Sequence, residues 1–164
     1  MTLAGVPCPP YTVCMARQLE SRDILIDRTV TDESNGVAPK TRLLIIDDRE
    51  TVRQALEARL SHAPEIELVG SAGGSEEGVR AALDLAPDIV LLEIKMADGK
   101  GLDTCRRITQ AKPSTAVIIL TSYVDEDERQ AAFQAGASSY VLKDIDSQRL
   151  IRAIEALRLK RCRV

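Results

Sequence analysis

The stretch Asp88-Ile-Val-Leu-Leu-Glu-Ile94, which is followed by Lys95-Met-Ala-Asp-Gly-Lys-Gly101, decides the fold of this chain. Its apolar core is short, rich in branched residues, preceded by a proline and followed by glycines. A run of this kind is typical of a strand that is buried on both faces of a parallel sheet. Its last polar residue is Glu93, and ligands bind at the carboxyl ends of strands in open α/β sheets. We therefore place Glu93 at the centre of any functional site.

Short apolar runs and helical stripes alternate along the chain on both sides of this strand. The predicted strands are 43–46, 66–69, 89–93, 116–120 and 139–142. Two predicted helices span 50–61 and 125–135, and a third is capped by Asp146 or Ser147. A helix capped by Ser75 is expected to end before Pro87, and a helix that carries Leu102, Cys105 and Ile108 is expected to end before Pro113. Gly70 is expected to end the second strand. Strands and helices that alternate at these lengths predict an α/β fold with a parallel sheet and right-handed crossovers.

The composition limits the classes of function. With 164 residues the chain can bury the core of one domain, and its net charge of −3 gives no general attraction to nucleic acid or to a membrane surface. No apolar segment approaches the roughly 20 residues of a membrane span, so we expect a cytoplasmic protein with reduced cysteines. Cys8 and Cys14 lack a usual zinc-ligand spacing, and Cys105 lies on an apolar helical face. The four cysteines are therefore expected to have no ligand role.

The chain divides into three segments by its sequence character. Residues 1–40 show no sustained period and contain many loop-forming residues, so we expect an N-terminal leader without stable structure. Residues 41–160 contain all the predicted strands and helices and form the domain. Residues 161–164 complete a basic end, which is typical of a solvated helix terminus. Met15 is an alternative start of translation, and the sequence does not decide between the two starts.

Polar residues follow four of the predicted strands at their carboxyl ends. These residues are Asp47, Asp48, Glu93, Thr121 and Lys143. Taken singly, each has an ordinary explanation, since an aspartate pair often caps a helix and a threonine or lysine at a strand end is often only solvated. The carboxyl ends of parallel strands meet at one edge of the sheet, so the set is more specific than its parts. Clustered carboxylates with a lysine and a hydroxyl suit Mg²⁺ and the positioning of a phosphoryl group.

Four sequence motifs at these strand ends carry a resemblance to a known family. They are Leu44-Ile-Ile-Asp-Asp48, Asp88-Ile-Val-Leu-Leu-Glu-Ile-Lys-Met96, Ile119-Leu-Thr-Ser122 and Ala135-Gly-Ala-Ser-Ser-Tyr-Val-Leu-Lys-Asp144. With these motifs, residues 41–160 resemble the receiver domain of two-component response regulators, and the last motif is most similar to receivers of NarL-type transcription factors. The resemblance implies the CheY-like fold, a doubly wound, flavodoxin-like (βα)5 sheet of five parallel strands in the order 2-1-3-4-5.

The resemblance also implies roles for individual residues. It places the Mg²⁺ ligands at Asp47, Asp48, Glu93 and the backbone carbonyl of Lys95, the phosphoacceptor position at Glu93, the switch hydroxyl at Thr121, the switch aromatic at Tyr140, the family's lysine at Lys143, and an interaction face that includes Tyr123 and Tyr140. In the family, a phosphoryl group on the acceptor shifts Thr121 and Tyr140 together. The cofactor implied is Mg²⁺, and the partner implied is a histidine kinase.

Three positions depart from the family pattern. The family's acceptor is aspartate, whereas Glu93 carries one more methylene, which moves the carboxylate by about 1 Å and disturbs in-line transfer. We therefore expect Glu93 not to accept a phosphoryl group, and Mg²⁺ to bind weakly if Glu93 pairs with Lys143; whether the longer acid imitates the phosphorylated state or is inert is left open. Ala97 replaces a proline and is expected to loosen the following loop. Asp144 also replaces a proline, as is frequent in NarL-type receivers.

The sequence favours a stand-alone, atypical receiver that signals by protein–protein contact and is not an enzyme beyond weak self-phosphorylation or dephosphorylation. Its expected partner is a histidine kinase or another signalling protein, with a homodimer left open and with no contact of this chain to nucleic acid or membrane. Two alternatives remain, a receiver that is phosphorylated and the receiver half of a NarL-type DNA-binding regulator that lacks its output domain. A flavodoxin-like cofactor binder is a third alternative by fold analogy, although no aromatic residue is evidently placed to stack a flavin.

Overall fold

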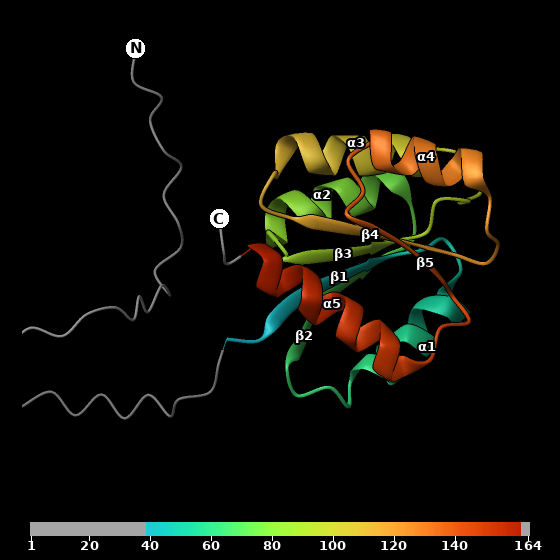
Figure 1. Ribbon diagram of the computed structural model, residues 1–164. Helices are drawn as coiled ribbons and strands as arrows, with labels where there is room; N and C mark the ends of the chain where they lie inside the picture. Colours follow the sequence, from blue (N-terminus) through green and yellow to red (C-terminus); the bar gives the residue numbers. More distant parts are fainter. Residues whose placement is uncertain (1–38, 162–164) are drawn as a thin grey trace, which may run out of the picture. The chain divides into compact units, whose positions relative to one another are not determined.

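The computed structural model describes residues 39–161, and Figure 1 shows how their helices and strands are arranged. The predictions for the leader, for Cys8, Cys14 and Cys162, and for most of the basic end lie outside the described residues. Between residues 39 and 161, no helix is both long and apolar enough to cross a membrane. Five strands alternate with five helices in this part of the chain, as the sequence predicts.

The elements have the following bounds. The strands are β1 (Thr41–Ile46), β2 (Ile66–Ala72), β3 (Ile89–Leu92), β4 (Ala116–Thr121) and β5 (Ser139–Leu142). The helices are α1 (Glu50–Leu60), α2 (Ser75–Leu85), α3 (Gly101–Ala111), α4 (Glu126–Gln134) and α5 (Ser147–Arg161).

The strands form one parallel sheet in the order β2-β1-β3-β4-β5, which confirms the predicted topology. The central strand β3 is buried along its whole length, since β1 and β4 flank it and helices cover both faces. Its register pairs Leu92 with Ile46 of β1 and with Ile119 of β4. The residues that follow these strands therefore emerge at one edge of the sheet.

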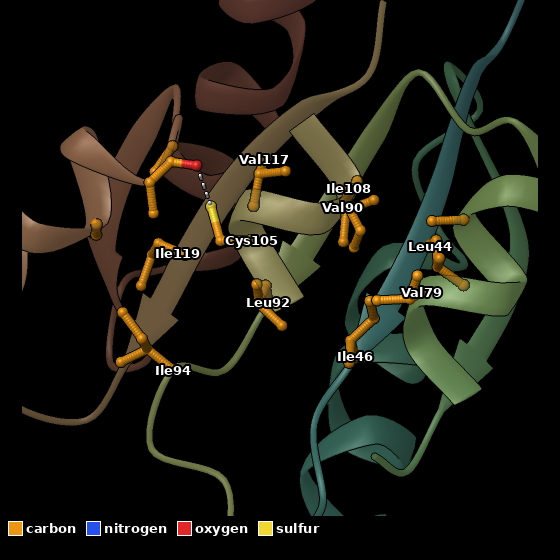
Figure 2. Packing of buried hydrophobic residues seen from close by; sticks show 14 of the residues in the cluster. Leu44, Ile46, Val79, Val90, Leu92, Ile94, Cys105, Ile108, Val117 and Ile119 are labelled. Atoms are coloured by element: carbon orange, nitrogen blue, oxygen red, sulfur yellow. Dashed lines mark hydrogen bonds between the residues drawn. The ribbon is translucent and has the colours of Figure 1, made fainter. Parts of the chain in front are cut away.

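Two apolar cores lie on the two faces of the sheet, because successive side chains of a strand point to opposite sides. Val90 and Leu92 of β3 pack in the core formed with α2, α3 and α4, and Figure 2 shows part of this core around Cys105. Ile89 and Leu91 pack in the core formed with α1 and α5. Figure 1 shows the same division, with α1 and α5 on one side of the sheet and the other three helices opposite. The packing of these two cores therefore holds the central strand, and the residues that follow it, from both faces of the sheet.

The second strand is longer than the sequence predicts. β2 continues through Gly70 to Ala72, although Gly70 was expected to end it. The pairing with β1 shifts here, since Leu43 pairs with Leu68 and Leu44 pairs with Gly70. A strand irregularity of this kind is where glycine is tolerated inside a strand, so the prediction that Gly70 stops the strand was wrong.

The N-cap of α2 differs from the predicted residue, and the structure decides between the two predicted N-caps of α5. Gly74 is the N-cap of α2 and Ser75 is the first helical residue, so the prediction of Ser75 as the cap was wrong. At α5, Asp146 Oδ1 accepts a hydrogen bond from Arg149 N at 2.9 Å. Asp146 rather than Ser147 therefore satisfies a free N–H of the first turn.

Candidate functional site

The predicted site residues lie at the carboxyl edge of the sheet. Asp47 and Asp48 follow β1, Glu93 follows β3, Thr121 ends β4 and Lys143 follows β5. Backbone hydrogen bonds continue the parallel pairing past the strand ends, from Glu93 N to Ile46 O at 2.8 Å and from Lys143 N to Thr121 O at 2.7 Å. The sheet therefore brings together side chains that are almost a hundred positions apart in the sequence.

Lys143 is the central cation of the site. Its Nζ lies 2.6 Å from Glu93 Oε2 and also pairs with Asp47 Oδ2. The side chains of Asp47 and Glu93 are only 2% and 3% exposed, so bulk water screens this cluster little. Because buried carboxylates need compensating charge, Lys143 stabilises both acids in one place.

Arg49 is a second cation of the same cluster, and the sequence analysis missed it. Its Nε lies 3.7 Å from Asp47 Oδ1, and its Nη2 lies 3.5 Å from Glu93 Oε2. Its backbone N–H also donates to Asp47 Oδ1 at 3.0 Å. The guanidinium side chain is 51% exposed, so it contacts the buried acids from the solvent side. The available signal was a cationic residue directly after the two aspartates that follow β1.

The second oxygen of Glu93 is also bonded. Glu93 Oε1 accepts a hydrogen bond from Lys95 N at 2.7 Å. Glu93 therefore uses one oxygen for the backbone of the next loop and the other for the two cations. This arrangement fixes the orientation of a buried carboxylate that the sequence analysis placed at the centre of the site.

Asp48 is bonded to the loop after β3. Its Oδ2 accepts a hydrogen bond from Ala97 N at 2.7 Å. Ala97 stands where the family usually has proline, and its N–H ties this loop to the end of β1. Proline cannot make such a bond because it has no N–H, so the alanine adds a contact that the family's usual residue could not provide.

The oxygen donors at this edge suit Mg²⁺, which takes one or two carboxylates and keeps several waters. The groups expected to hold the ion are Asp47, Asp48, Glu93 and the backbone carbonyl of Lys95, and the ion would supply positive charge beside the acids. Across residues 39–161, no three acidic, histidine or cysteine side chains converge as a preformed cage for a metal. Lys143 and Arg49 contact Asp47, and the Ala97 amide holds Asp48. Any Mg²⁺ therefore competes with groups of the chain itself.

A second network connects the site to α4. Tyr140 Oη donates to Glu128 Oε1 at 2.8 Å and lies 3.3 Å from Tyr123 O, while Lys95 Nζ lies 3.3 Å from Glu128 Oε2. Burial, together with the hydrogen bond and charge of Glu128, raises the pKa of Tyr140 to about 12. Thr121 Oγ1 is buried, and its contact with the Tyr140 hydroxyl acts on that pKa in the opposite, lowering direction. Glu128 is a second residue that sequence reasoning missed, since it reads only as an acid in the first turn of a helix.

An open pocket of about 360 Å³ lies over these groups. It is lined by Asp48, Arg49, Glu93, Lys95, Ala97, Thr121, Ser122 and Tyr123. Most of the predicted site residues therefore share one concave surface. Asp47, Tyr140 and Lys143 are not among the lining residues. Lys143 forms ion pairs with both Asp47 and Glu93, and Tyr140 hydrogen-bonds to Tyr123 and Glu128.

Comparisons with known proteins identify the family of this chain. The model of the response regulator receiver domain family matches residues 43–155. The transcriptional regulatory protein LiaR of Bacillus subtilis (strain 168) is 38% identical over 115 residues, which are 70% of this chain and 54% of LiaR. The DNA-binding transcriptional activator DevR/DosR of Mycobacterium tuberculosis is 36% identical over 114 residues, which are 70% of this chain and 52% of that protein. The chain spans about half the length of these relatives.

Solved structures show the same fold. A two-component response regulator of the LuxR family from Aurantimonas sp. SI85-9A1 is 29% identical, with a TM-score of 0.69 over 74% of this chain and 86% of that one. The signal receiver domain of NarL from Mycobacterium tuberculosis has the same TM-score, 0.69, at 21% identity over 74% of this chain and 98% of that one, which supports the fold alone. With the five-stranded topology and the family match together, the chain belongs to the receiver domains of two-component response regulators.

Proposed function

We propose that this receiver domain signals through protein contacts and does not accept a phosphoryl group at Glu93. The observation that carries the proposal is the engagement of the Glu93 carboxylate. Its Oε1 lies 2.7 Å from Lys95 N, and its Oε2 lies 2.6 Å from Lys143 Nζ. Glu93 thus serves as a fixed acid of the pocket rather than as a nucleophile.

The chemistry of phosphoryl transfer supports this proposal. Transfer requires a carboxylate oxygen placed in line with the leaving group, and misplacement by about 1 Å lowers the rate strongly. Glu93 Oε2 can attack a donor only after it separates from Lys143 and Arg49. The extra methylene of glutamate also extends the carboxylate toward Lys143, so the two side chains meet without a phosphoryl group between them.

The proposed output is a contact made by the surface next to β5 and α4. Tyr123, Val124 and Phe133 are large apolar side chains that are 71%, 67% and 47% exposed. We propose a histidine kinase or another signalling protein as the partner of this surface. The ion pair of Lys95 with Glu128 and the hydrogen bond of Tyr140 to Glu128 would couple the loop after Glu93 to it.

The experiment that tests this function is incubation with acetyl phosphate in excess Mg²⁺, followed by intact mass measurement. The native chain is expected to keep its mass, and Glu93→Asp is expected to gain one phosphoryl group because it restores the shorter acid. Glu76→Asp makes the same chemical change at an exposed ion pair of α2 and is the matched control, expected to behave as the native chain. A phosphoryl adduct that maps to Glu93 in the native chain would contradict the proposal.

The negative charge of Glu93 can be tested apart from phosphorylation. If Glu93 imitates the phosphorylated state, Glu93→Gln should change the affinity for the partner while Glu76→Gln should not. If Glu93 is inert, both variants should bind alike. This comparison decides between the two roles of the longer acid.

A second candidate function is that of the receiver part of a DNA-binding transcription regulator. The observation that favours it is the similarity to LiaR and DevR/DosR, of which the chain spans about half the length. Sequencing the transcript beyond the codon of Val164 tests this candidate. A continuous reading frame that encodes a helix-turn-helix would support it, and a stop codon at that point would exclude it.

A further inference from the structure

Arg49 contacts both buried acids of the site, and the proposed function uses only its contact with Glu93. It follows Asp47 and Asp48 directly and precedes α1 as its N-cap residue. Its side chain makes no capping hydrogen bond, and its guanidinium instead extends over the acidic cluster to Glu93, 44 positions away in the sequence. A cation placed in this way needs an explanation beyond helix formation.

The charge balance of the pocket provides that explanation. Asp47 and Glu93 present two buried negative charges, and Lys143 alone supplies one positive charge. Arg49 supplies the second, at 3.5 Å from Glu93 and 3.7 Å from Asp47. Opposite charges at this separation attract several times more strongly near a protein surface than in bulk water. Two acids are therefore matched by two cations that belong to the chain.

The position of Arg49 is also that of a competitor for metal ions. The guanidinium of Arg49 already lies 3.7 Å from Asp47 Oδ1. A divalent cation bound to that oxygen would be repelled by the guanidinium, because both carry positive charge. The third acid is held independently, since Asp48 Oδ2 accepts the Ala97 N–H at 2.7 Å. The carboxylates of Asp47 and Asp48, which are expected to bind the metal ion, are thus both engaged by other groups of this chain.

We propose that Arg49 is the built-in cation of the acidic pocket, which competes with divalent metal ions and keeps the pocket compensated without them. Because the guanidinium is 51% exposed, it can leave the acids for solvent, and a divalent ion binds when it does so. This inference deepens the proposed function by naming the residue that sets the metal affinity of the same site. It is independent of whether Glu93 accepts a phosphoryl group.

The test is Mn²⁺ binding, measured by electron paramagnetic resonance on the whole chain without any phosphodonor. The R49Q variant removes the guanidinium and is expected to bind Mn²⁺ about tenfold more tightly than the native chain. R106Q is the matched control, because Arg106 has a side chain 53% exposed on α3 and pairs with Asp103 across one turn, at 3.9 Å. It removes the same charge from a similarly exposed position and is expected to leave the Mn²⁺ affinity within about twofold of the native value.

A second measurement does not depend on the folding of the variant. In the native chain, the Arg49 Nε–H resonance and the Ala97 amide resonance are followed by NMR during addition of Mg²⁺. Both are expected to shift with the same midpoint, since the ion displaces the guanidinium from Asp47 and draws Asp48 from the loop.

R49K keeps the charge and is expected to bind Mn²⁺ more weakly than R49Q.

The outcomes separate this inference from the proposed function. Equal Mn²⁺ affinity in the native chain and R49Q, an equal gain in R49Q and R106Q, or an Arg49 resonance that stays unmoved while Ala97 shifts would each overturn the role of Arg49. None of these results concerns the phosphoryl adduct on Glu93. Conversely, an adduct on Glu93 would overturn the proposed function and leave the Mn²⁺ comparison standing.

Discussion

Lys143 Nζ lies 2.6 Å from Glu93 Oε2, and the same ammonium pairs with Asp47 at the end of β1. This relationship joins β1, β3 and β5 at one edge of the sheet through charge, where the backbone ladder alone would leave two buried acids facing each other. Lys143 therefore stabilises this edge of the sheet. The charge compensation that it provides leads to the first prediction.

Lys143→Met is expected to lower the free energy of unfolding by at least about 2 kcal/mol, because it leaves buried carboxylates without their main cation. Urea denaturation followed by circular dichroism measures the loss. Lys100→Met, at an exposed position before α3, is the control and should change stability by less than about 0.5 kcal/mol. Equal stability of the two variants would mean that the ion pair with Glu93 is not formed in solution.

The hydroxyl of Tyr140 should titrate far above the ordinary range. Burial and the Glu128 carboxylate raise its pKa to about 12. Because the folded state favours the neutral phenol, the resulting stabilisation is complete below the unfolded pKa of about 10 and is lost as the pH rises from about 10 to 12. Glu128→Gln should lower the pKa of Tyr140, while burial keeps it above the ordinary value.

Ultraviolet absorbance of phenolate against pH measures the Tyr140 titration, and Tyr140→Phe identifies its contribution among the three tyrosines of the chain. Glu126→Gln is the matched control, since Glu126 lies in the same helical turn but pairs with Arg129 instead. If Glu126→Gln and Glu128→Gln shift the titration equally, the hydrogen bond from Tyr140 to Glu128 has no measurable effect.

Cys105 should resist alkylation as long as the domain is folded. It is fully buried in the core shown in Figure 2, its Sγ donates to Ala135 O at 3.7 Å, and burial raises its pKa to about 11. The thiolate that reacts with iodoacetamide is therefore both scarce and inaccessible near pH 8. Peptide mass mapping should find Cys105 unmodified in buffer and modified in urea. Equal labelling in the two conditions would show that this core opens readily.

Gly101 should tolerate no side chain. A Cβ at this position would collide with the backbone carbonyl group of Ile94, so α3 could not begin where it does beside the strand that leads to Glu93. Gly101→Ala is expected to cost about 1 to 3 kcal/mol of stability. Gly74→Ala is the control, because its Cβ would meet no atom within 4 Å and its φ of −171° is open to any residue. Thermal unfolding that ranks Gly74→Ala as the more damaging change would contradict this packing.

The sequence was sufficient for the sheet and for the positions of the central acids. The apolar run before Glu93 and the pairing of strand ends with polar residues predict which side chains meet, because parallel strands place their carboxyl ends at one edge. The topology brings Lys143 and Glu93 to the same edge, but β4 lies between their strands, so their direct contact also depends on the conformation of the long lysine side chain.

The remaining parts depend on local geometry that residue types do not encode. Arg49 reads as an exposed residue before a helix, and only its side-chain conformation brings the guanidinium to Glu93. The bond from Ala97 N to Asp48 Oδ2 depends on the path of the loop, which residue types do not specify. Gly70 lies at a shift of the register between β1 and β2, and an irregular position of this kind accepts glycine inside a strand. Residue type alone does not show where such a shift occurs.

Cations of the chain hold Glu93, and in the proposed function it does not accept a phosphoryl group. Fluorine NMR of beryllofluoride, a phosphoryl analogue, in excess Mg²⁺ tests this with the native chain and with Glu93→Asp. We expect no protein-bound fluorine signal for the native chain and a bound signal for Glu93→Asp. A saturable bound signal from the native chain that disappears in Glu93→Gln would contradict it.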